Sequence, residues 1–124
     1  MTCYDLRFPE SARRAVDAGA DVLLCPAAWA AGPGKIEQWT VLAQARAIEN
    51  TVFVVAVGMA GRGVCGSSMV VGPDGTVRAR LGLDPAQVTV DLDHGDVVRT
   101  RERNPSLVNR RFAVVPREGT GADG

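Results

Sequence analysis

A cysteine stands at the third position of the chain, a few residues before a segment with the features of a helix start. Pro9 suits the first position of a helix, and Glu10 favours the positive end of the helix dipole. At a turn into a helix, this positive end and nearby donors favour the thiolate form of a cysteine. Cys3 is therefore a candidate nucleophile, and the backbone N–H of Tyr4 is a candidate donor to an oxyanion. On this pattern alone, a structural cysteine is the more common alternative.

The other cysteines and the one histidine carry weaker signals. Cys25 lies within the apolar run 21–26, so we expect it to be an unreactive core residue. Cys65 lies in a glycine-rich loop where it could be exposed, but nothing beside it suggests a base. His94 has no closely spaced partner ligands, so we expect it at a helix start or in a loop and expect no metal site.

Residues 61–66 match the pattern G-x-G-x-x-G that is typical of dinucleotide-binding turns. That fingerprint requires a helix directly afterwards, so that the helix N-terminus can hold the pyrophosphate. Here the following residues predict a strand and a turn. We therefore expect a loop between two strands, and a nucleotide site is excluded if no helix follows Gly66.

A local basic run follows a group of aspartates that has no basic residue among its members. Neutralisation of one group by the other, across strands or at a subunit contact, explains the pattern better than anion or nucleic-acid binding. The members are Arg99, Arg101, Arg103, Arg110 and Arg111 in the basic run, and Asp84, Asp91, Asp93 and Asp96 in the acidic group.

Hydrophobic periodicity predicts the elements that must position these residues. Helices are predicted over 9–18, 35–50 and 96–103, and strands over 21–26, 51–57, 67–72, 76–81 and 87–93. Pro73-Asp-Gly75 predicts the turn of a hairpin, and Val88, Val90 and Leu92 alternate with polar neighbours in the last strand. The order of elements predicts an α/β fold with a mixed sheet. The helix over 35–50 is apolar on two sides and is predicted to be covered on both.

Composition excludes several classes of protein. The chain has 124 residues, of which 46% are hydrophobic and 23% charged, and 14 Lys and Arg balance 14 Asp and Glu. This balance lacks the basic footprint of a nucleic-acid binder. No apolar run approaches the ~20 residues that cross a bilayer, so no membrane span is expected. The odd cysteine count and the lack of a signal peptide predict a cytoplasmic setting with free thiols.

The segment Cys3-Tyr-Asp-Leu-Arg-Phe-Pro-Glu10 resembles the nucleophile motif of the nitrilase, or carbon–nitrogen hydrolase, superfamily. Further segments are similar in order and spacing, over nearly the whole chain apart from its tail. They are Gly19-Ala-Asp-Val-Leu-Leu24, Pro26-Ala-Ala-Trp29, Gln38-Trp39, Ala45-Arg-Ala-Ile-Glu-Asn-Thr51, Gly66-Ser-Ser68, Pro73-Asp-Gly75 and Asn109-Arg-Arg111. Within the superfamily, the chain is similar to amidases that act on small ω-amides or deaminated glutathione.

The resemblance implies a four-layer αββα sandwich, of which this chain is the C-terminal half. It implies hydrolysis of a non-peptide C–N bond in a small amide through a thioester intermediate, without a metal or an organic cofactor. It also implies a homodimer or a larger homo-oligomer in the full-length form. No nucleic acid or membrane is implied as a partner.

Carried over by position, Cys3 is the nucleophile and the Tyr4 N–H is an oxyanion donor. The resemblance also implies that three residues following a predicted strand line the substrate pocket. Two further residues are implied to organise the turn through an ion pair. The pocket residues are Ala27, Ala28 and Trp29, and the organising residues are Arg7 and Glu10.

The chain departs from the family pattern in its catalytic triad. The family places a glutamate and a lysine well before the cysteine, whereas two residues precede Cys3. The single lysine, Lys35, lies downstream and is not assigned to that role, and neither are Glu37 and Glu49.

Each missing group is typically worth about 10²–10³-fold in rate, so we expect no activity from the chain alone. We expect residues 1–115 to form a partial hydrolase domain without its N-terminal half, from a fragment or from a start placed at an internal methionine. A disordered tail is expected over 116–124. The alternative is a truncated, non-catalytic paralogue that acts as a dimerisation or binding module.

Overall fold

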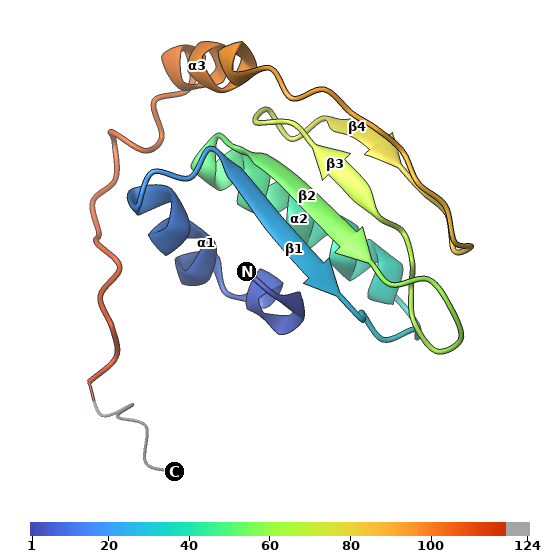
Figure 1. Ribbon diagram of the computed structural model, residues 1–124. Coiled ribbons are helices and arrows are strands. Elements are labelled where there is room, and N and C mark those ends of the chain that lie inside the picture. The colour runs from blue at the N-terminus through green and yellow to red at the C-terminus, as the bar shows by residue number, and fades with distance from the viewer. Residues whose placement is uncertain (119–124) are drawn as a thin grey trace.

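The computed structural model describes residues 1–118, which form one sheet and the helices around it (Figure 1). A short 3₁₀ helix opens the chain, and helices and strands then alternate up to a hairpin. In chain order the elements are η1 (Cys3–Arg7), α1 (Pro9–Asp17), β1 (Val22–Ala27), α2 (Lys35–Asn50), β2 (Phe53–Gly58), β3 (Met69–Val71), β4 (Val77–Arg80) and α3 (His94–Arg103).

Helices α1 and α2 begin and end within one residue of the predicted positions. Pro9 is the first residue of α1, where its missing N–H costs no hydrogen bond. Gly34, with a φ of +69°, precedes α2, and Thr51, with a φ of +50°, ends it. The left-handed backbone at Thr51 turns the chain directly from α2 into β2.

The sheet has the order β1-β2-β3-β4 and is mixed, as predicted. β1 and β2 are parallel, with Val22 beside Phe53 and Leu24 beside Val55, and α2 makes the crossover between them. β2, β3 and β4 are antiparallel neighbours, and β3 and β4 form the predicted hairpin. The carboxyl ends of β1 and β2 therefore meet at one edge of the sheet.

The main core lies between one face of the sheet and the layer of η1, α1 and α2 (Figure 1). Alternate residues of β1 point into it, and Trp39 of α2 is its largest fully buried side chain. Its buried members include Leu6, Ala12, Leu23, Cys25, Trp39, Ala43, Ala47, Val54, Ala56 and Val71. This packing fixes η1 against β1 and α2.

On the opposite face of the sheet, no helix of residues 1–118 covers β1 or most of β2 (Figure 1). Leu24 is 60% exposed and Val57 is 50% exposed on this face. At the amino ends of β1 and β2, α3 is tied to the fold by a hydrogen bond between His94 and Asp21 and by an ion pair from Arg101 to Asp21. Within residues 1–118, no helix has the length and apolar character needed to span a bilayer.

Two sequence predictions are wrong, one about a strand and the other about the covering of α2. Residues 87–93 form no strand, because within residues 1–118 they have no neighbouring strand with which to pair. The second apolar side of α2 is not covered either, since Val41 and Ile48 are exposed. Both differences come from packing partners that the described residues do not supply.

The remaining differences are small. The helix predicted over 96–103 begins earlier, at His94, because the carboxylate of Asp93 accepts a hydrogen bond from the N–H of Gly95 at 2.8 Å. Residues 116–118 belong to no helix or strand. The rest of the predicted disordered tail, 119–124, lies outside the described residues, so the boundary at residue 116 stays a prediction.

Candidate active site

Cys3 is the first residue of η1 and has left-handed backbone, with a φ of +47°. Asp5 closes this turn twice: its N–H donates to the Thr2 carbonyl at 3.0 Å, and its carboxylate accepts from the Thr2 N–H at 2.9 Å. The side chain of Cys3 is partly exposed and packs against the main core. Such backbone is uncommon outside glycine and is often found at functional sites. The expected turn into a helix is present, but a 3₁₀ turn separates Cys3 from α1.

A buried arginine of α2 anchors the turn from the other side. Arg46 is 4% exposed, and its Nε donates to the Leu6 carbonyl at 3.1 Å. Its second nitrogen pairs with Glu49 at 2.9 Å, so the buried charge is neutralised within α2. Sequence reasoning assigned no role to Arg46, although its spacing of three residues from Glu49 was a signal for this pair. Because Glu49 is engaged here, it is not free to act as a base at Cys3.

Arg7 contacts an aromatic platform and an amide, and the predicted ion pair with Glu10 is not formed. Its guanidinium lies 4.6 Å from the centre of the Trp29 ring and 5.8 Å from the centre of the Tyr4 ring. It donates to the Gln38 Oε1 at 3.0 Å. A planar guanidinium stacks well on an indole, so Arg7 is held by Trp29 and Gln38 instead of by Glu10. Glu10 is exposed in the first turn of α1, and no ion pair within residues 1–118 includes it.

The three predicted pocket residues differ in their accessibility. Ala27 and Trp29 are buried, and Ala28 is exposed at the carboxyl edge of β1. The Trp29 Nε1 donates to the Lys35 carbonyl at 2.9 Å, and the ring packs against Trp39 with centroids 5.3 Å apart. Trp39 in turn donates to the Ser67 carbonyl at 3.0 Å. Trp29 is thus a rigid platform beneath Arg7, and Ala28 is the one of the three predicted pocket residues whose side chain is exposed.

The glycine loop is tied to the end of β1, next to these residues. The Met59 N–H donates to the Ala27 carbonyl and the Cys65 N–H to the Trp29 carbonyl, both at 2.8 Å. Cys65 is buried, and its thiol donates to the Ala30 carbonyl at 3.3 Å, so the expectation that it could be exposed is wrong. The loop therefore walls the carboxyl edge of β1 and β2, the usual place for a ligand crevice in α/β folds.

The nucleotide interpretation of this loop is excluded. Gly66 is followed by β3 and then by the hairpin turn, so no helix N-terminus is available for a pyrophosphate.

Two further groups, Cys25 and the basic run, are explained by their surroundings in the fold. Burial raises the pKa of the Cys25 thiol, and the positive amino terminus and a hydrogen bond from the Cys3 backbone only partly oppose this. Cys25 is therefore a protonated core residue, as predicted. Three arginines of the basic run form ion pairs: Arg99 with Asp93 at 3.0 Å and with Asp96 at 2.6 Å, Arg101 with Asp21 at 2.9 Å, and Arg110 with Asp17.

His94 starts α3 as expected and hydrogen-bonds the Asp21 carboxylate at 2.8 Å. Among residues 1–118, no three His, Cys, Asp or Glu side chains gather as ligands for a metal ion.

A family model for carbon–nitrogen hydrolases matches residues 1–102 of the chain. Deaminated glutathione amidase from Escherichia coli O157:H7 is 42% identical over 113 residues, which cover 91% of this chain and 43% of that protein. The chain belongs to the carbon–nitrogen hydrolase family. It spans between 34% and 60% of the length of the curated relatives that we compared.

Solved structures of the superfamily share this fold. Nit3 from Saccharomyces cerevisiae, a member of branch 10 of the nitrilase superfamily, matches 90% of this chain with a TM-score of 0.81 and 32% identity. A mutant amidase from Nesterenkonia sp. AN1 matches 90% of this chain with a TM-score of 0.74 and 33% identity. In that structure the acetamide moiety of fluoroacetamide is covalently added to the active-site cysteine. This chain covers 42% of Nit3 and 40% of the amidase chain.

Proposed function

We propose that this chain is the nucleophile-bearing part of an amidase and that Cys3 is the nucleophile. The observation that carries the proposal is the backbone of Cys3, a left-handed, partly exposed cysteine that opens a turn held on both sides by hydrogen bonds. The modified cysteine of the Nesterenkonia amidase supports the same chemistry in a relative. Neither Cys25 nor Cys65 offers an alternative, because both are buried.

The proposed reaction has two steps. The Cys3 thiolate attacks the carbonyl carbon of a small amide, and the oxygen takes on negative charge. The Tyr4 N–H is the second amide of η1, a position without a partner inside the helix, so it is available to this oxyanion. The C–N bond breaks, ammonia leaves with the proton that the Cys3 thiol released when it became a thiolate, and a thioester remains on Cys3. Water then attacks the thioester, which releases the acid and restores the thiol.

The other site residues position the groups that react. Ala28 has a small, exposed side chain at the edge of β1 and leaves room for a small amide beside the turn. Ala27 and Trp29 form the rigid base of this wall. Arg7 acts as a positioning residue, because it ties η1 to Trp29 and Gln38. The proposed role of Glu10 is to stabilise α1, because its carboxylate in the first turn lies near the positive end of the helix dipole.

We propose that the 124-residue chain is inactive alone, since no residue here matches the family glutamate and lysine. The complete hydrolase is proposed to be cytoplasmic, to act on a small amide without nucleic acid, and to form a homodimer or larger homo-oligomer. A second candidate function, a non-catalytic dimerisation or binding module, is favoured by the uncovered apolar face of the sheet.

Ammonia release from short ω-amides tests this proposal, with the chain and its Cys3→Ala variant compared side by side. We expect no turnover from either protein. Turnover that is lost in Cys3→Ala would refute the inactivity of the chain while supporting Cys3 as nucleophile. Turnover that survives in Cys3→Ala would refute the nucleophile itself.

A further inference from the structure

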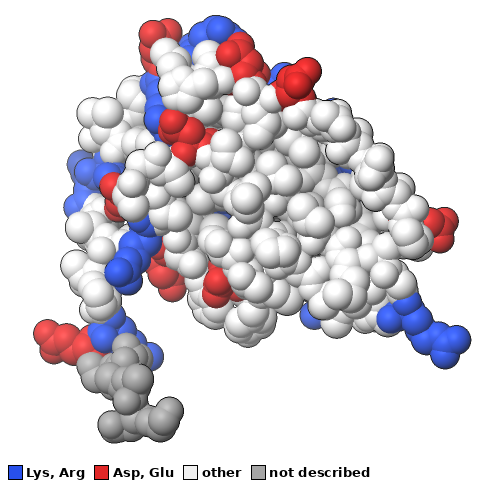
Figure 2. All heavy atoms as spheres, in the orientation of Figure 1, with Lys and Arg blue, Asp and Glu red and all other residues white. Residues whose placement is uncertain are grey.

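Arg46 is the one charged side chain among the buried residues of the described chain, 1–118. On the face shown in Figure 2, the charged side chains stand mostly at the margin, in contact with solvent. The guanidinium of Arg46 instead donates to the Leu6 carbonyl at 3.1 Å and to the Glu49 carboxylate at 2.9 Å. Burial of a charge is costly, and these two hydrogen bonds offset that cost.

The Leu6 carbonyl requires a side-chain donor because of Pro9. In a continuous helix this carbonyl would accept from the N–H three or four residues later, at position 9 or 10. Pro9 has no N–H, and within residues 1–118 the backbone N–H of Glu10 does not donate to Leu6. Leu6 is fully buried, so bulk water does not reach it. The Nε of Arg46 therefore satisfies a carbonyl that Pro9 leaves unpaired.

This carbonyl lies close to the proposed nucleophile along the chain. Leu6 follows Cys3 by one turn of η1, because a 3₁₀ helix has three residues per turn. Hydrogen bonds in such a helix have poor geometry, so the five residues of η1 depend on contacts at both ends. The two hydrogen bonds of Asp5 hold the first end, and Arg46 holds the last. Tyr4, whose N–H is the proposed oxyanion donor, lies between them.

The last turn of α2 is a firm support for Arg46. The Nδ2 of Asn50, a fully buried residue, donates to the Arg46 carbonyl at 2.8 Å. Arg13 of α1 donates to the Glu49 carbonyl, also at 2.8 Å. The same turn of α2 thus holds both η1 and α1, on the two sides of Pro9.

We propose that Arg46 is a positioning residue of the amidase site. Through the Leu6 carbonyl it holds η1 so that the Tyr4 N–H faces the oxyanion that forms when the Cys3 sulfur attacks a carbonyl carbon. This inference rests on the proposed function of Cys3. Loss of Arg46 should slow attack on a carbonyl more than attack on a saturated carbon, because only the first reaction develops an oxyanion.

Two reagents separate these reactions on the 124-residue chain. 4-Nitrophenyl acetate acylates the Cys3 thiolate: a bond from sulfur to the acetyl carbon forms, the bond to the aryl oxygen breaks, and 4-nitrophenolate leaves with the electron pair. 2-Chloroacetamide alkylates the same sulfur by displacement of chloride from a saturated carbon. Both adducts are followed by mass spectrometry on peptide 1–7, where removal by hydroxylamine distinguishes the thioester from acetylation of the amino terminus.

Alkylation depends on the accessibility and ionisation of the thiol, so the ratio of the acylation to the alkylation rate constant isolates the oxyanion donor. We expect Arg46→Met, which keeps an unbranched stem but no donor, to lower this ratio about tenfold. Arg46→Lys keeps one charged donor and should restore part of the loss, to a ratio about threefold below wild type. A merely structural contribution of Arg46 would lower stability without changing the ratio.

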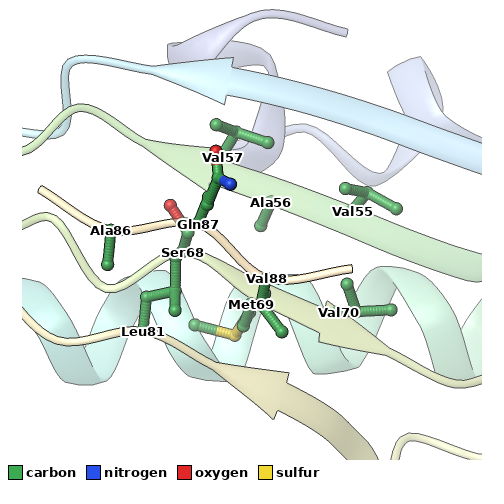
Figure 3. A pocket seen from close by; sticks show the side chains of 10 residues that line it. All are labelled: Val55, Ala56, Val57, Ser68, Met69, Val70, Leu81, Ala86, Gln87 and Val88. Carbon is green, nitrogen blue, oxygen red and sulfur yellow. The ribbon is translucent and has the colours of Figure 1, made fainter. Parts of the chain in front are cut away.

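Val70→Ala is the matched control for lost stability. Val70 is 8% exposed and lines a cavity of about 240 Å³ between β2, β3 and residues 86–88 (Figure 3). The lining of this cavity includes no charged side chain, and Val70 is not a member of the core that packs against η1. The substitution is expected to destabilise the chain by loss of buried methyl groups and to leave the ratio unchanged.

Circular dichroism checks that each variant folds, and Arg46→Lys alone decides if Arg46→Met is unfolded. An unchanged ratio in the folded Arg46 variants would overturn the inference and leave Cys3 as the nucleophile. An equal fall in Val70→Ala would overturn it as well, and so would a wild-type Cys3 that is alkylated but not acylated. A wild-type Cys3 that reacts with neither reagent would instead refute the proposed function.

Discussion

The guanidinium of Arg7 lies 4.6 Å from the centre of the Trp29 indole ring and thereby joins the turn that begins at Cys3 to the end of β1. Trp29 is itself fixed by a hydrogen bond to the Lys35 carbonyl and by contact with Trp39. The position of the proposed nucleophile therefore depends on an aromatic pair that belongs to the core.

Replacement of Arg7 by lysine should weaken this connection. Lysine keeps the charge but loses the planar group that stacks on Trp29 and donates to Gln38. We expect a loss of about 0.5–2 kcal/mol in the free energy of unfolding, measured by urea denaturation. Arg14→Lys, at an exposed position of α1, is the matched control and should change stability by less than about 0.5 kcal/mol. Equal effects of the two substitutions would show that the stacking contributes nothing.

Substitution of Gly58 by alanine should distort the wall of the site. A Cβ at this position would collide with the backbone carbonyl oxygen of Gly66, which cannot move without breaking the loop. We expect Gly58→Ala to lower the free energy of unfolding by about 1–3 kcal/mol or more. Gly82→Ala is the control, because its Cβ would meet nothing within 4 Å. The prediction is checked by thermal or urea unfolding of both variants, and it fails if the two are equally stable.

The agreement between sequence and structure is greatest where a signal is local. Pro9 starts α1, and Pro73-Asp-Gly75 makes the hairpin, because each of these residues restricts its own backbone. The apolar run of β2 likewise identified a central strand, whose two neighbours are β1 and β3. These features require no knowledge of distant residues.

Features that depend on distant partners could not be predicted in the same way. Residues 87–93 have the alternation of a strand, but a strand also needs a neighbour. The partner of Arg7 could not be read from its motif, since Trp29 and Gln38 reach it only through the fold. The burial of Cys65 follows from hydrogen bonds to the end of β1, far from it in sequence.

The stability of the chain should fall at alkaline pH because of Cys25. Burial raises the pKa of this thiol in the folded state, so below the ordinary thiol range both states are protonated and no penalty arises. As the pH rises through that range, the unfolded chain releases the proton while the folded chain retains it, and the unfolded state gains stability. The expected loss is at most about 1.4 kcal/mol per pH unit from this group.

Urea denaturation of the chain and of Cys25→Ala at neutral and alkaline pH measures this effect. The variant is expected to be less stable at neutral pH, because it leaves a cavity, but to lose less stability on going to alkaline pH. An identical pH dependence in the two proteins would show that Cys25 does not cause the alkaline loss.

The central claim, that Cys3 is the reactive nucleophile, is tested most directly by labelling the folded chain with 2-chloroacetamide and mapping the adduct by mass spectrometry. Cleavage after Lys and Arg places the three cysteines in separate peptides, 1–7, 15–35 and 63–78. We predict an adduct on peptide 1–7 alone, no adduct on the folded Cys3→Ala variant, and labelling of Cys25 and Cys65 only after denaturation. An adduct on Cys25 or Cys65 of the folded chain, with Cys3 unmodified, would contradict the assignment of Cys3 as the nucleophile.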